Sequence, residues 1–139
     1  MNIFSIYLKK VREFLIDLEK SKKIKLSDNL KNVTIDLTPK GLQGDISCNA
    51  PLVLSKPNSK KPKDIATTLK KNLIKKFPEF KNIYIAEPGF LNIEFNEDFW
   101  EKFLRNLLNF KEKYGSHYSK KNKYNIEFVS ANPTGPLHV

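Results

Sequence analysis

The residues with the greatest chemical potential lie between Ile126 and Val139. A buried strand is predicted from Tyr124 to Val129, and it leads into a turn rich in proline and glycine. Hydroxyl, amide and imidazole groups follow in Ser130, Asn132, Thr134 and His138. Such a turn at the carboxyl end of a strand can build a nucleotide site, and a helix starting after it would direct backbone N–H groups at phosphate. The alternative for His138 is an ordinary exposed or capping residue.

A second candidate site lies on a strand predicted from Phe90 to Phe95. Side chains alternate along a strand, so Phe90 and Asn92 emerge on one face, opposite Leu91 and Ile93. An aromatic ring there could stack on a nucleobase while the amide reads the edge of that base. The alternative is that Phe90 belongs to the core and Asn92 to a turn.

Three regular elements are predicted before residue 60. Apolar residues recur every three or four positions from Asn2 to Lys22, which indicates an amphipathic helix with a buried stripe. Apolar and polar residues alternate from Val33 to Leu37, which is typical of a half-buried strand. A short helix is predicted from Asn49 to Lys56, with Asn49 as its N-cap and Pro51 in its first turn.

A lysine-rich helix is predicted next, starting at Pro62 after a polar loop. Its expected buried face comprises Ile65, Ala66, Leu69, Leu73 and Ile74. Between Lys56 and Lys76, eight lysines stand against one acidic residue, Asp64. A solvated helix face explains this surface, and contact with an RNA backbone is the alternative.

A hairpin and one more helix complete the predicted domain. Two apolar runs, residues 83–86 and 90–95, flank Glu87, Pro88 and Gly89, which predicts a β-hairpin with a Pro-Gly turn. An amphipathic helix is predicted from Glu97 to Phe110, and we expect its aromatic stripe to lie in the core. The order of elements favours an α+β fold over residues 1–110, with helices on one face of a small, mainly antiparallel sheet. Residues 111–123 would be a linker, and residues 124–139 would begin a second domain.

The composition indicates a soluble, cytoplasmic protein that can approach a polyanion. The formal net charge is +10, nearly all of it from lysine, which suits an RNA surface but also fits a bias in composition. Cys48 is the only cysteine, so an internal disulfide and a multi-thiolate metal site are excluded. No run approaches the roughly 20 apolar residues of a membrane span. We expect a monomer with no membrane partner, no metal site and no bound prosthetic group.

The string from Glu127 to Val139, EFVSANPTGPLHV, resembles the segment of arginyl-tRNA synthetases that leads into the class I His-x-Gly-His motif. The resemblance runs in order over about residues 40–139. It includes Gly44-Asp45, Asn49-Ala50, the helix from Pro62 to Leu73 and the segment from Ala86 to Asn92. The family usually has glycine where this chain has Glu87. Only the first histidine of the motif is present, as His138.

The resemblance implies an enzyme that activates arginine with ATP and Mg²⁺ and esterifies it to tRNA(Arg), using a Rossmann-like catalytic domain. His138 would bind ATP and stabilise the transition state. The implied ATP-binding motif comprises Ala131, Asn132, Pro133, Thr134, Gly135, Pro136, Leu137, His138 and Val139. Glu127 and Asn132 would hold arginine, with Ser130 in the same pocket, because a carboxylate can bind a guanidinium through paired hydrogen bonds. With the motif incomplete, we expect this chain alone to be inactive.

The resemblance also implies that residues 1–110 bind the D-loop of tRNA(Arg). Phe90 and Asn92 match an aromatic and an amide that hold a base, and Glu87 lies beside them, where an acid could accept a base amino group or repel phosphate. A stand-alone RNA-binding module without catalysis is the alternative function. A plain α+β domain is a further alternative, in which the lysines would scatter evenly instead of flanking Phe90 and Asn92.

Overall fold

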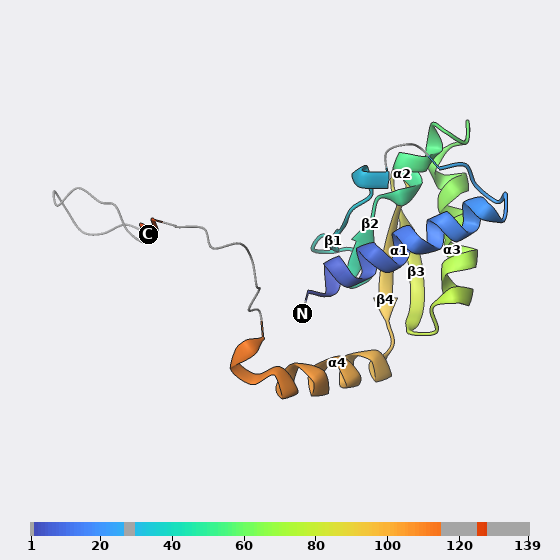
Figure 1. Ribbon diagram of the computed structural model, residues 1–139. Coiled ribbons are helices and arrows are strands. Elements are labelled where there is room, and N and C mark those ends of the chain that lie inside the picture. The colour runs from blue at the N-terminus through green and yellow to red at the C-terminus, as the bar shows by residue number, and fades with distance from the viewer. Residues whose placement is uncertain (1, 27–29, 115–124, 128–139) are drawn as a thin grey trace.

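The described part of the chain is built around one small antiparallel sheet. The computed structural model describes residues 2–26, 30–114 and 125–127 (Figure 1). Four strands, β1 (Ile35–Leu37), β2 (Ile46–Cys48), β3 (Phe80–Ala86) and β4 (Phe90–Phe95), are arranged in the order β1-β2-β4-β3. Every neighbouring pair is antiparallel. The predicted hairpin is confirmed, and β3 starts three residues earlier than expected.

The sequence does not predict β2, although this strand lies inside the sheet. β2 has only three residues, and a polar one, Ser47, stands in the middle, so no periodic signal can develop. Its neighbours define it instead, because Ile46 pairs with Ile93. Cys48 is wholly buried, and this burial raises the pKa of its thiol to about 11. The strand is therefore formed by tertiary pairing.

Three helices, α1 (Ile3–Lys20), α2 (Ala50–Ser55) and α3 (Pro62–Lys76), cover one face of the sheet (Figure 1). Their buried side chains meet the strand residues that point the same way as Leu91 and Ile93. Members of this shared core include Val11, Leu15, Leu54, Leu69, Leu73, Ile46 and Ile83. Burial of a single sheet face is common in antiparallel sheets. The predicted α+β fold with helices on one face is confirmed.

Asn49 precedes α2 as predicted, but its side chain does not cap that helix. Its Oδ1 accepts a hydrogen bond from the backbone N–H of Thr34 at 2.8 Å. Its Nδ2 donates to the backbone oxygen of Asn32 at 3.0 Å. These main-chain groups lie just before β1, and the amide satisfies both of them. Asn49 thus joins the start of β1 to the start of α2.

Two apolar residues expected in the core lie at its margin. Ile74 is 38% exposed, because it follows Leu73 by one residue and is rotated away from the buried stripe of α3. Leu37 is 72% exposed, at the end of the three-residue edge strand β1. For both residues the predicted element is correct and the predicted burial is wrong.

Helix α4 (Glu97–Phe110) has the predicted bounds but not the predicted burial. Asn96 is its N-cap, and the Asn96 Oδ1 accepts a hydrogen bond from the backbone N–H of Phe99 at 2.8 Å. The ring of Phe99 stacks on Phe95 at 4.1 Å between centroids, yet no residue of α4 is buried, and Leu108 is 70% exposed. Figure 1 shows the helix leaving the sheet at one end. Only its first turns reach the core, so the expectation that the whole stripe lies there is wrong.

Residues 125–127 do not form the strand predicted at residues 124–129. They are exposed, and no strand of the described part of the chain pairs with them. A strand is stabilised by hydrogen bonds to a neighbouring strand, and hydrophobic alternation alone does not supply them. The other residues of this predicted strand lie outside the described ranges.

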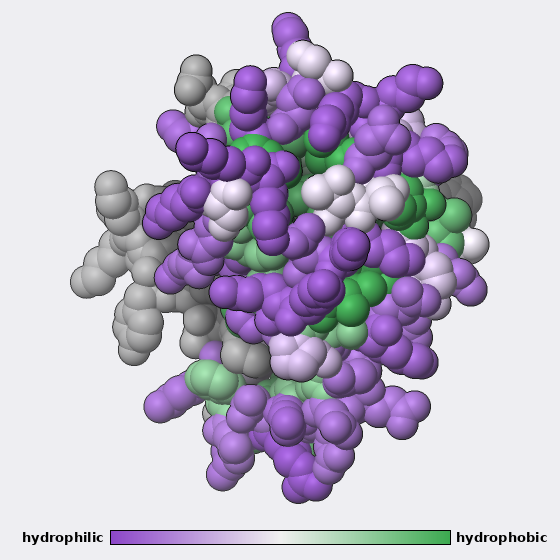
Figure 2. Space-filling view, turned by 90° about the vertical axis from the view of Figure 1, so that its right-hand side faces the viewer, coloured by the Kyte–Doolittle hydropathy of each residue, from purple (hydrophilic) through white to green (hydrophobic). Residues whose placement is uncertain are grey.

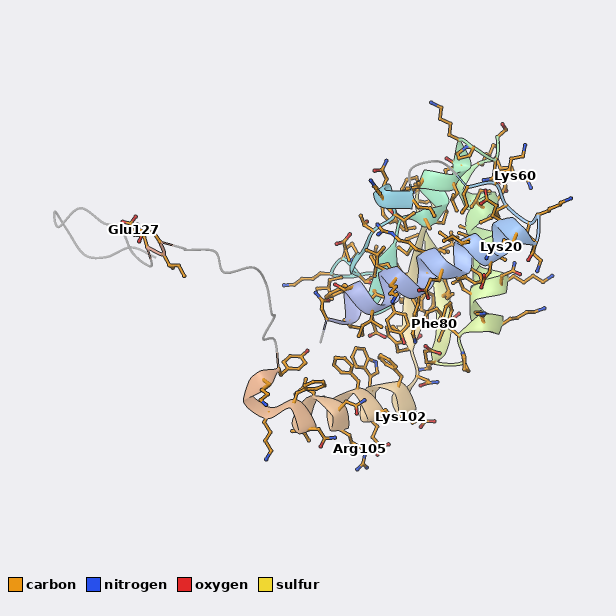
Figure 3. The ribbon with its side chains drawn as sticks, viewed as in Figure 1. Lys20, Lys60, Phe80, Lys102, Arg105 and Glu127 are labelled. Atoms are coloured by element: carbon orange, nitrogen blue, oxygen red, sulfur yellow. The ribbon has the colours of Figure 1, made fainter. Side chains whose placement is uncertain are left out.

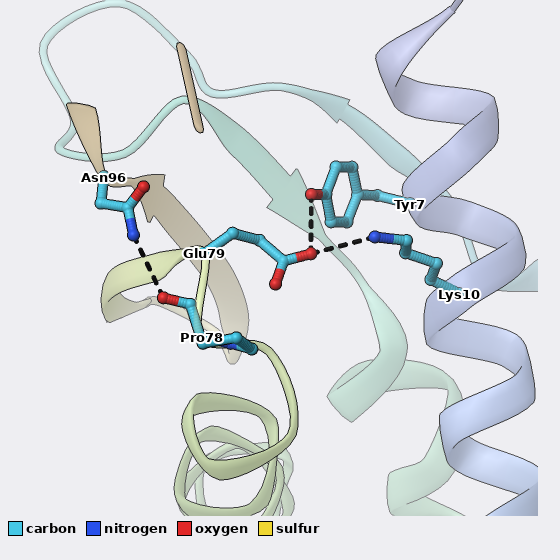
Figure 4. Close-up of polar contacts among 5 residues, drawn as sticks. All are labelled: Tyr7, Lys10, Pro78, Glu79 and Asn96. Carbon is cyan, nitrogen blue, oxygen red and sulfur yellow. Dashed lines mark hydrogen bonds and ion pairs between the residues drawn. The ribbon is translucent and has the colours of Figure 1, made fainter. Parts of the chain in front are cut away.

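Glu79 ties α1 to the segment before β3, close to the start of α4 (Figure 4). Its Oε1 accepts hydrogen bonds from Tyr7 Oη and Lys10 Nζ, each at 3.0 Å, while Asn96 Nδ2 donates to the backbone oxygen of Pro78 at 3.1 Å. Burial raises the pKa of Tyr7 well above its usual value, and the hydrogen bond to Glu79 adds to this. Partial burial acts to raise the pKa of Glu79, but hydrogen bonds from its own backbone, Lys10 and Tyr7 outweigh it and hold that pKa below normal.

Candidate nucleic-acid interface

The face of the sheet opposite the helices carries a row of polar side chains, one from each strand. The register aligns Asp36 with Ser47, Ser47 with Asn92, and Asn92 with Tyr84. Residues that pair across antiparallel strands point to the same side. Phe90 is on this face as well, because it precedes Asn92 by two positions on β4.

A groove of about 220 Å³ opens on this face, beside β1 and the turn between β3 and β4. Its walls are formed by Thr34, Asp36, Leu37, Pro39, Leu42, Ser47, Ala86, Glu87 and Phe90. The half-buried ring of Phe90 and the exposed Leu37 supply apolar surface, and carboxylates and hydroxyls stand around them. An aromatic ring beside polar groups is an arrangement that holds a nucleobase by stacking and hydrogen bonding.

Asn92 lies next to the groove but behind its wall. Asn92 is 2% exposed, and its Oδ1 accepts a hydrogen bond from Ser47 Oγ at 2.8 Å. Gly44 packs against it from the loop that joins β1 to β2. At its φ of +109°, a Cβ on Gly44 would lie 3.0 Å from both the carbonyl carbon and the Cβ of Asn92. Glycine at this position therefore allows the loop to pass close to the backbone of Asn92.

The turn between β3 and β4 brings the lysine-rich helix to the groove. Gly89 has a φ of +149°, and a Cβ on it would lie 2.6 Å from Pro62 Cβ, so the turn packs directly on the first turn of α3. Lys63 Nζ lies 3.5 Å from Glu87 Oε1, and both side chains are exposed. An exposed pair of this kind adds little stability. Its position matters more, because it places the start of the basic helix at the rim of the groove.

Basic side chains are distributed over several elements. Figure 3 shows Lys20 on α1, Lys60 before α3, and Lys102 and Arg105 on α4. Figure 2, seen from the side that carries α3, is largely hydrophilic with small apolar patches between. Lysines are therefore not confined to the groove. The basic residues that lie at the rim of the groove are those at the start of α3.

The polar row ends at a second cluster on the far side of Asn92. Tyr84 Oη donates to Glu94 Oε2 at 2.8 Å, and Lys81 Nζ lies 2.9 Å from Glu94 Oε1. The hydrogen bond from Lys81 is the main cause of the lowered pKa of Glu94, and the same contact raises the pKa of Lys81. These groups are already satisfied by one another, unlike the open groove at the other end of the row.

Of the residues predicted to bind the substrates arginine and ATP, the structure describes only Glu127. Glu127 is exposed and makes no hydrogen bond or ion pair with the other described residues. The remaining residues of this prediction, from Ser130 to His138 and Val139, lie outside the described ranges. The structure brings Glu87, Phe90 and Asn92 together, and it does not join Glu127 to them.

Sequence reasoning missed the groove residues on β1 and β2. Asp36, Leu37 and Ser47 line it, yet they come from strands far from Phe90 in the sequence. The available signal was the single polar residue inside Ile46-Ser47-Cys48, flanked by two buried neighbours. In a sheet strand, such a residue points away from the core.

Two statements about possible ligands and membranes hold for residues 2–26, 30–114 and 125–127 of the chain. No group of three or more His, Cys, Asp or Glu side chains there could hold a metal ion. No helix there is long and apolar enough to cross a membrane.

Comparison with known proteins identifies one family over the sheet and its helices. Residues 6–95 match the model of the arginyl tRNA synthetase N terminal domain, which ends where β4 ends. Over its whole length the chain is 42% identical to the arginine--tRNA ligase of Pelagibacter ubique (strain HTCC1062) and covers 24% of it. It is 37% identical to that of Paracoccus denitrificans (strain Pd 1222), again covering 24%. Over 78% of the chain it is 40% identical to that of Lawsonia intracellularis (strain PHE/MN1-00), covering 20%. The chain thus spans about a quarter or less of these relatives.

Proposed function

The chain belongs to the arginyl-tRNA synthetase family, and on this premise we propose that residues 2–95 bind the D-loop of tRNA(Arg) at the groove beside Phe90. The observation that carries the proposal is the groove itself. It joins an aromatic ring to carboxylates and hydroxyls on the open face of the sheet, within the residues that the family model matches. Single-stranded loops are the part of an RNA whose bases can leave the stack and enter such a groove.

Each groove residue has a role that follows from its chemistry. The Phe90 ring stacks on a base, and the Glu87 carboxylate at the rim accepts a hydrogen bond from an amino group of that base. Asn92 supports the site from behind Ser47. The carboxylates of Asp36 and Glu87 repel phosphate, so the groove suits a base and not the backbone. Lysines at the start of α3 supply the phosphate contacts instead.

The whole protein is proposed to be a class I arginine--tRNA ligase of the cytoplasm, acting as a monomer on arginine, ATP with Mg²⁺ and tRNA(Arg). Residues 124–139 would begin its Rossmann-like catalytic domain. Glu127, Ser130 and Asn132 would bind arginine, and residues 131–139 would form the start of the ATP-binding motif, with His138 as the catalytic residue. The resemblance of the string EFVSANPTGPLHV supports these roles.

Binding of the 139-residue chain to three RNAs tests the D-loop proposal. The first is tRNA(Arg), the second is tRNA(Arg) with a single D-loop base replaced, and the third is an unrelated tRNA. Each is measured at two salt concentrations. We expect a preference for tRNA(Arg) that survives the higher salt. Equal and salt-sensitive binding to all three would leave only a basic surface.

Phe90→Ala locates the site. Loss of one stacked base costs about 1–3 kcal/mol of binding free energy. Phe110→Ala is the matched control, because Phe110 is an exposed aromatic residue on α4, away from the groove. An unchanged affinity in Phe90→Ala, or an equal loss in both variants, would remove Phe90 from the site. Lysine-to-glutamine changes on α3 should instead reduce the salt dependence.

A further inference from the structure

A cleft of about 310 Å³ opens in the helix layer, on the other side of the sheet from the groove. It lies between the second half of α1 and the last turns of α3. Its polar lining comprises Asp17, Ser21, Lys23, Asn72, Lys75 and Lys76. Three ammonium groups stand against one carboxylate, so the lining carries an excess of two positive charges and attracts anions.

The three lysines of this cleft are only weakly engaged. Lys76 Nζ lies 3.9 Å from Asp17 Oδ2, and both side chains are more than half exposed, so this pair is loose. Lys23 Nζ donates a hydrogen bond to Asn72 Oδ1 at 3.2 Å, and this neutral acceptor leaves the lysine charge uncompensated. Lys75 forms no ion pair within the described part of the chain. A phosphate group that enters the cleft therefore has little to displace.

The turn after α1 carries Lys23 across to α3. The backbone N–H of Lys23 donates to the Leu18 oxygen at 3.0 Å, and that of Lys22 donates to the Glu19 oxygen at 2.8 Å. These two bonds form the Schellman arrangement of a helix C-terminus. Lys22 takes the left-handed position of this motif, with a φ of +56°, where glycine is usual because a Cβ is strained. A strained lysine thus stands at the turn that brings a second lysine to the cleft.

Stabilisation of helix ends accounts for only part of this cluster. A lysine near a helix C-terminus interacts favourably with the partial negative charge of the last carbonyls, which explains Lys75 and Lys76 in the last turn of α3. The same argument does not explain Lys23, which lies beyond the end of α1 and contacts the other helix. The position of Lys23 therefore indicates a role for the cleft itself.

The exposure of the lysines favours an extended polyanion over a single small anion. Lys23, Lys75 and Lys76 are all exposed, so a free phosphate ion would remain hydrated there and gain little. An RNA strand presents consecutive phosphates, and each lysine that neutralises one of them releases condensed counterions. Lys63 at the rim of the groove and Lys76 lie about 20 Å apart along α3, at about 1.5 Å per residue. The cleft is therefore a contact separate from the groove.

We propose that this cleft binds the ribose-phosphate backbone of RNA through Lys23, Lys75 and Lys76, as a second contact that reads no base. The inference does not require the proposed D-loop binding at the groove, because phosphate contacts position a nucleic acid and carry no sequence information. The cleft contributes affinity that every RNA shares, whereas the groove contributes the preference for tRNA(Arg).

The salt dependence of tRNA binding to the 139-residue chain tests the cleft. The cleft variant changes Lys23, Lys75 and Lys76 to glutamine. The control variant loses the same charge at three exposed lysines elsewhere, namely Lys9, Lys31 and Lys102. We expect the slope of log Kd against log salt to fall by about two to three in the cleft variant, at about 0.7–0.9 per phosphate contact, and by less than about one in the control. The fall should be the same for tRNA(Arg) and an unrelated tRNA.

Asp17→Asn tests the same surface with the opposite sign. It removes the carboxylate of the cleft, so we expect both tRNAs to bind more tightly at low salt, by roughly two- to fivefold, the scale of one exposed charge pair. Asp98→Asn is the control, because Asp98 is an exposed acid on α4, and it should leave both affinities near the wild-type values. Thermal unfolding of every variant reports on folding.

Acetylation of lysines, followed by mass spectrometry, locates the contact directly. Bound tRNA should protect Lys23, Lys75 and Lys76 from the reagent and leave Lys9 and Lys102 reactive. Uniform protection of all five lysines, with equal falls in slope in the two triple variants, would overturn the cleft and leave only distributed charge.

Two further outcomes separate this inference from its rivals. Displacement of tRNA by inorganic phosphate at constant ionic strength would overturn the RNA contact, because it would indicate a site for a small anion. A reduced slope in the cleft variant together with an unchanged affinity in Phe90→Ala would refute the proposed function of the groove and support the cleft.

Discussion

Two regions of the chain carry equally clear apolar patterns: residues 2–95, which we call the body, and helix α4. Only the body buries its apolar residues. In α1 and α3 the residues at helical spacing are almost all inside the core. In α4 the same spacing leaves Leu104 and Leu108 more than half exposed. An amphipathic pattern therefore specifies which face of a helix is apolar, and it does not specify the surface that covers this face.

Shortening a buried side chain inside the body should have the largest effect on stability. Ile93 is wholly buried and pairs with Ile46 and Ile83 at the centre of the sheet. Ile93→Ala should lower the free energy of unfolding by about 2–5 kcal/mol, through lost burial and a residual cavity. Denaturant unfolding measures it, with Leu108→Ala on α4 as the control. Similar losses in both variants would contradict the contrast between the two regions.

The loop that covers Asn92 should be the next most sensitive position. Gly44→Ala places a Cβ 3.0 Å from the Asn92 backbone at a φ of +109°, so we expect a loss of about 1–3 kcal/mol. Gly41→Ala is the matched control, because Gly41 also has a positive φ, of +86°, but a Cβ there meets nothing within 4 Å. If the two variants lost the same stability, the close approach to Asn92 would have no energetic role.

The contact that joins α1 to the segment before β3 should show a smaller, pH-dependent effect. The pKa of Glu79 is lower in the folded chain than in an unfolded one. Its contribution is therefore complete above the ordinary carboxyl pKa and is lost as the pH falls through the folded pKa. Glu79→Gln should cost about 1 kcal/mol at neutral pH, and the cost should shrink in acid. Urea titrations at several pH values test this, and parallel wild-type and variant curves would exclude it.

Polar substitution on the outer face of α4 should have the smallest effect. Leu108→Ser changes an exposed side chain, so the free energy of unfolding of the isolated chain should shift by less than about 0.5 kcal/mol. Thermal unfolding at two protein concentrations is the measurement. A larger, concentration-dependent loss would mean that this face is already covered in a second copy.

Most elements of the fold could be predicted because their signals are local. The helical stripe of α1, the start of α3 at Pro62 and the turn before Phe90 each depend on a few consecutive residues. β2 could not be predicted, since three residues carry no period and its partners lie outside it in sequence. The exposure of α4 could not be predicted for a related reason. It arises because no other element in the described part of the chain covers the apolar face of this helix.

The candidate site divides in the same way. Alternation along β4 was enough to place Phe90 and Asn92 on one face. The burial of Asn92 was not predictable, because it depends on Gly44 and on a hydrogen bond to Ser47. The arginine and ATP residues remain predictions, since all except Glu127 lie outside the described ranges.

The buried thiol of Cys48 gives the chain a built-in reporter. It is the only cysteine, it is adjacent to Ser47 on β2, and its pKa of about 11 leaves little thiolate at neutral pH. A thiol reagent can modify it only when β2 separates from its neighbours, so the labelling rate measures how often this strand opens. Slower labelling in the presence of tRNA would reveal that the ligand holds the groove strand in place, and no cysteine would have to be introduced.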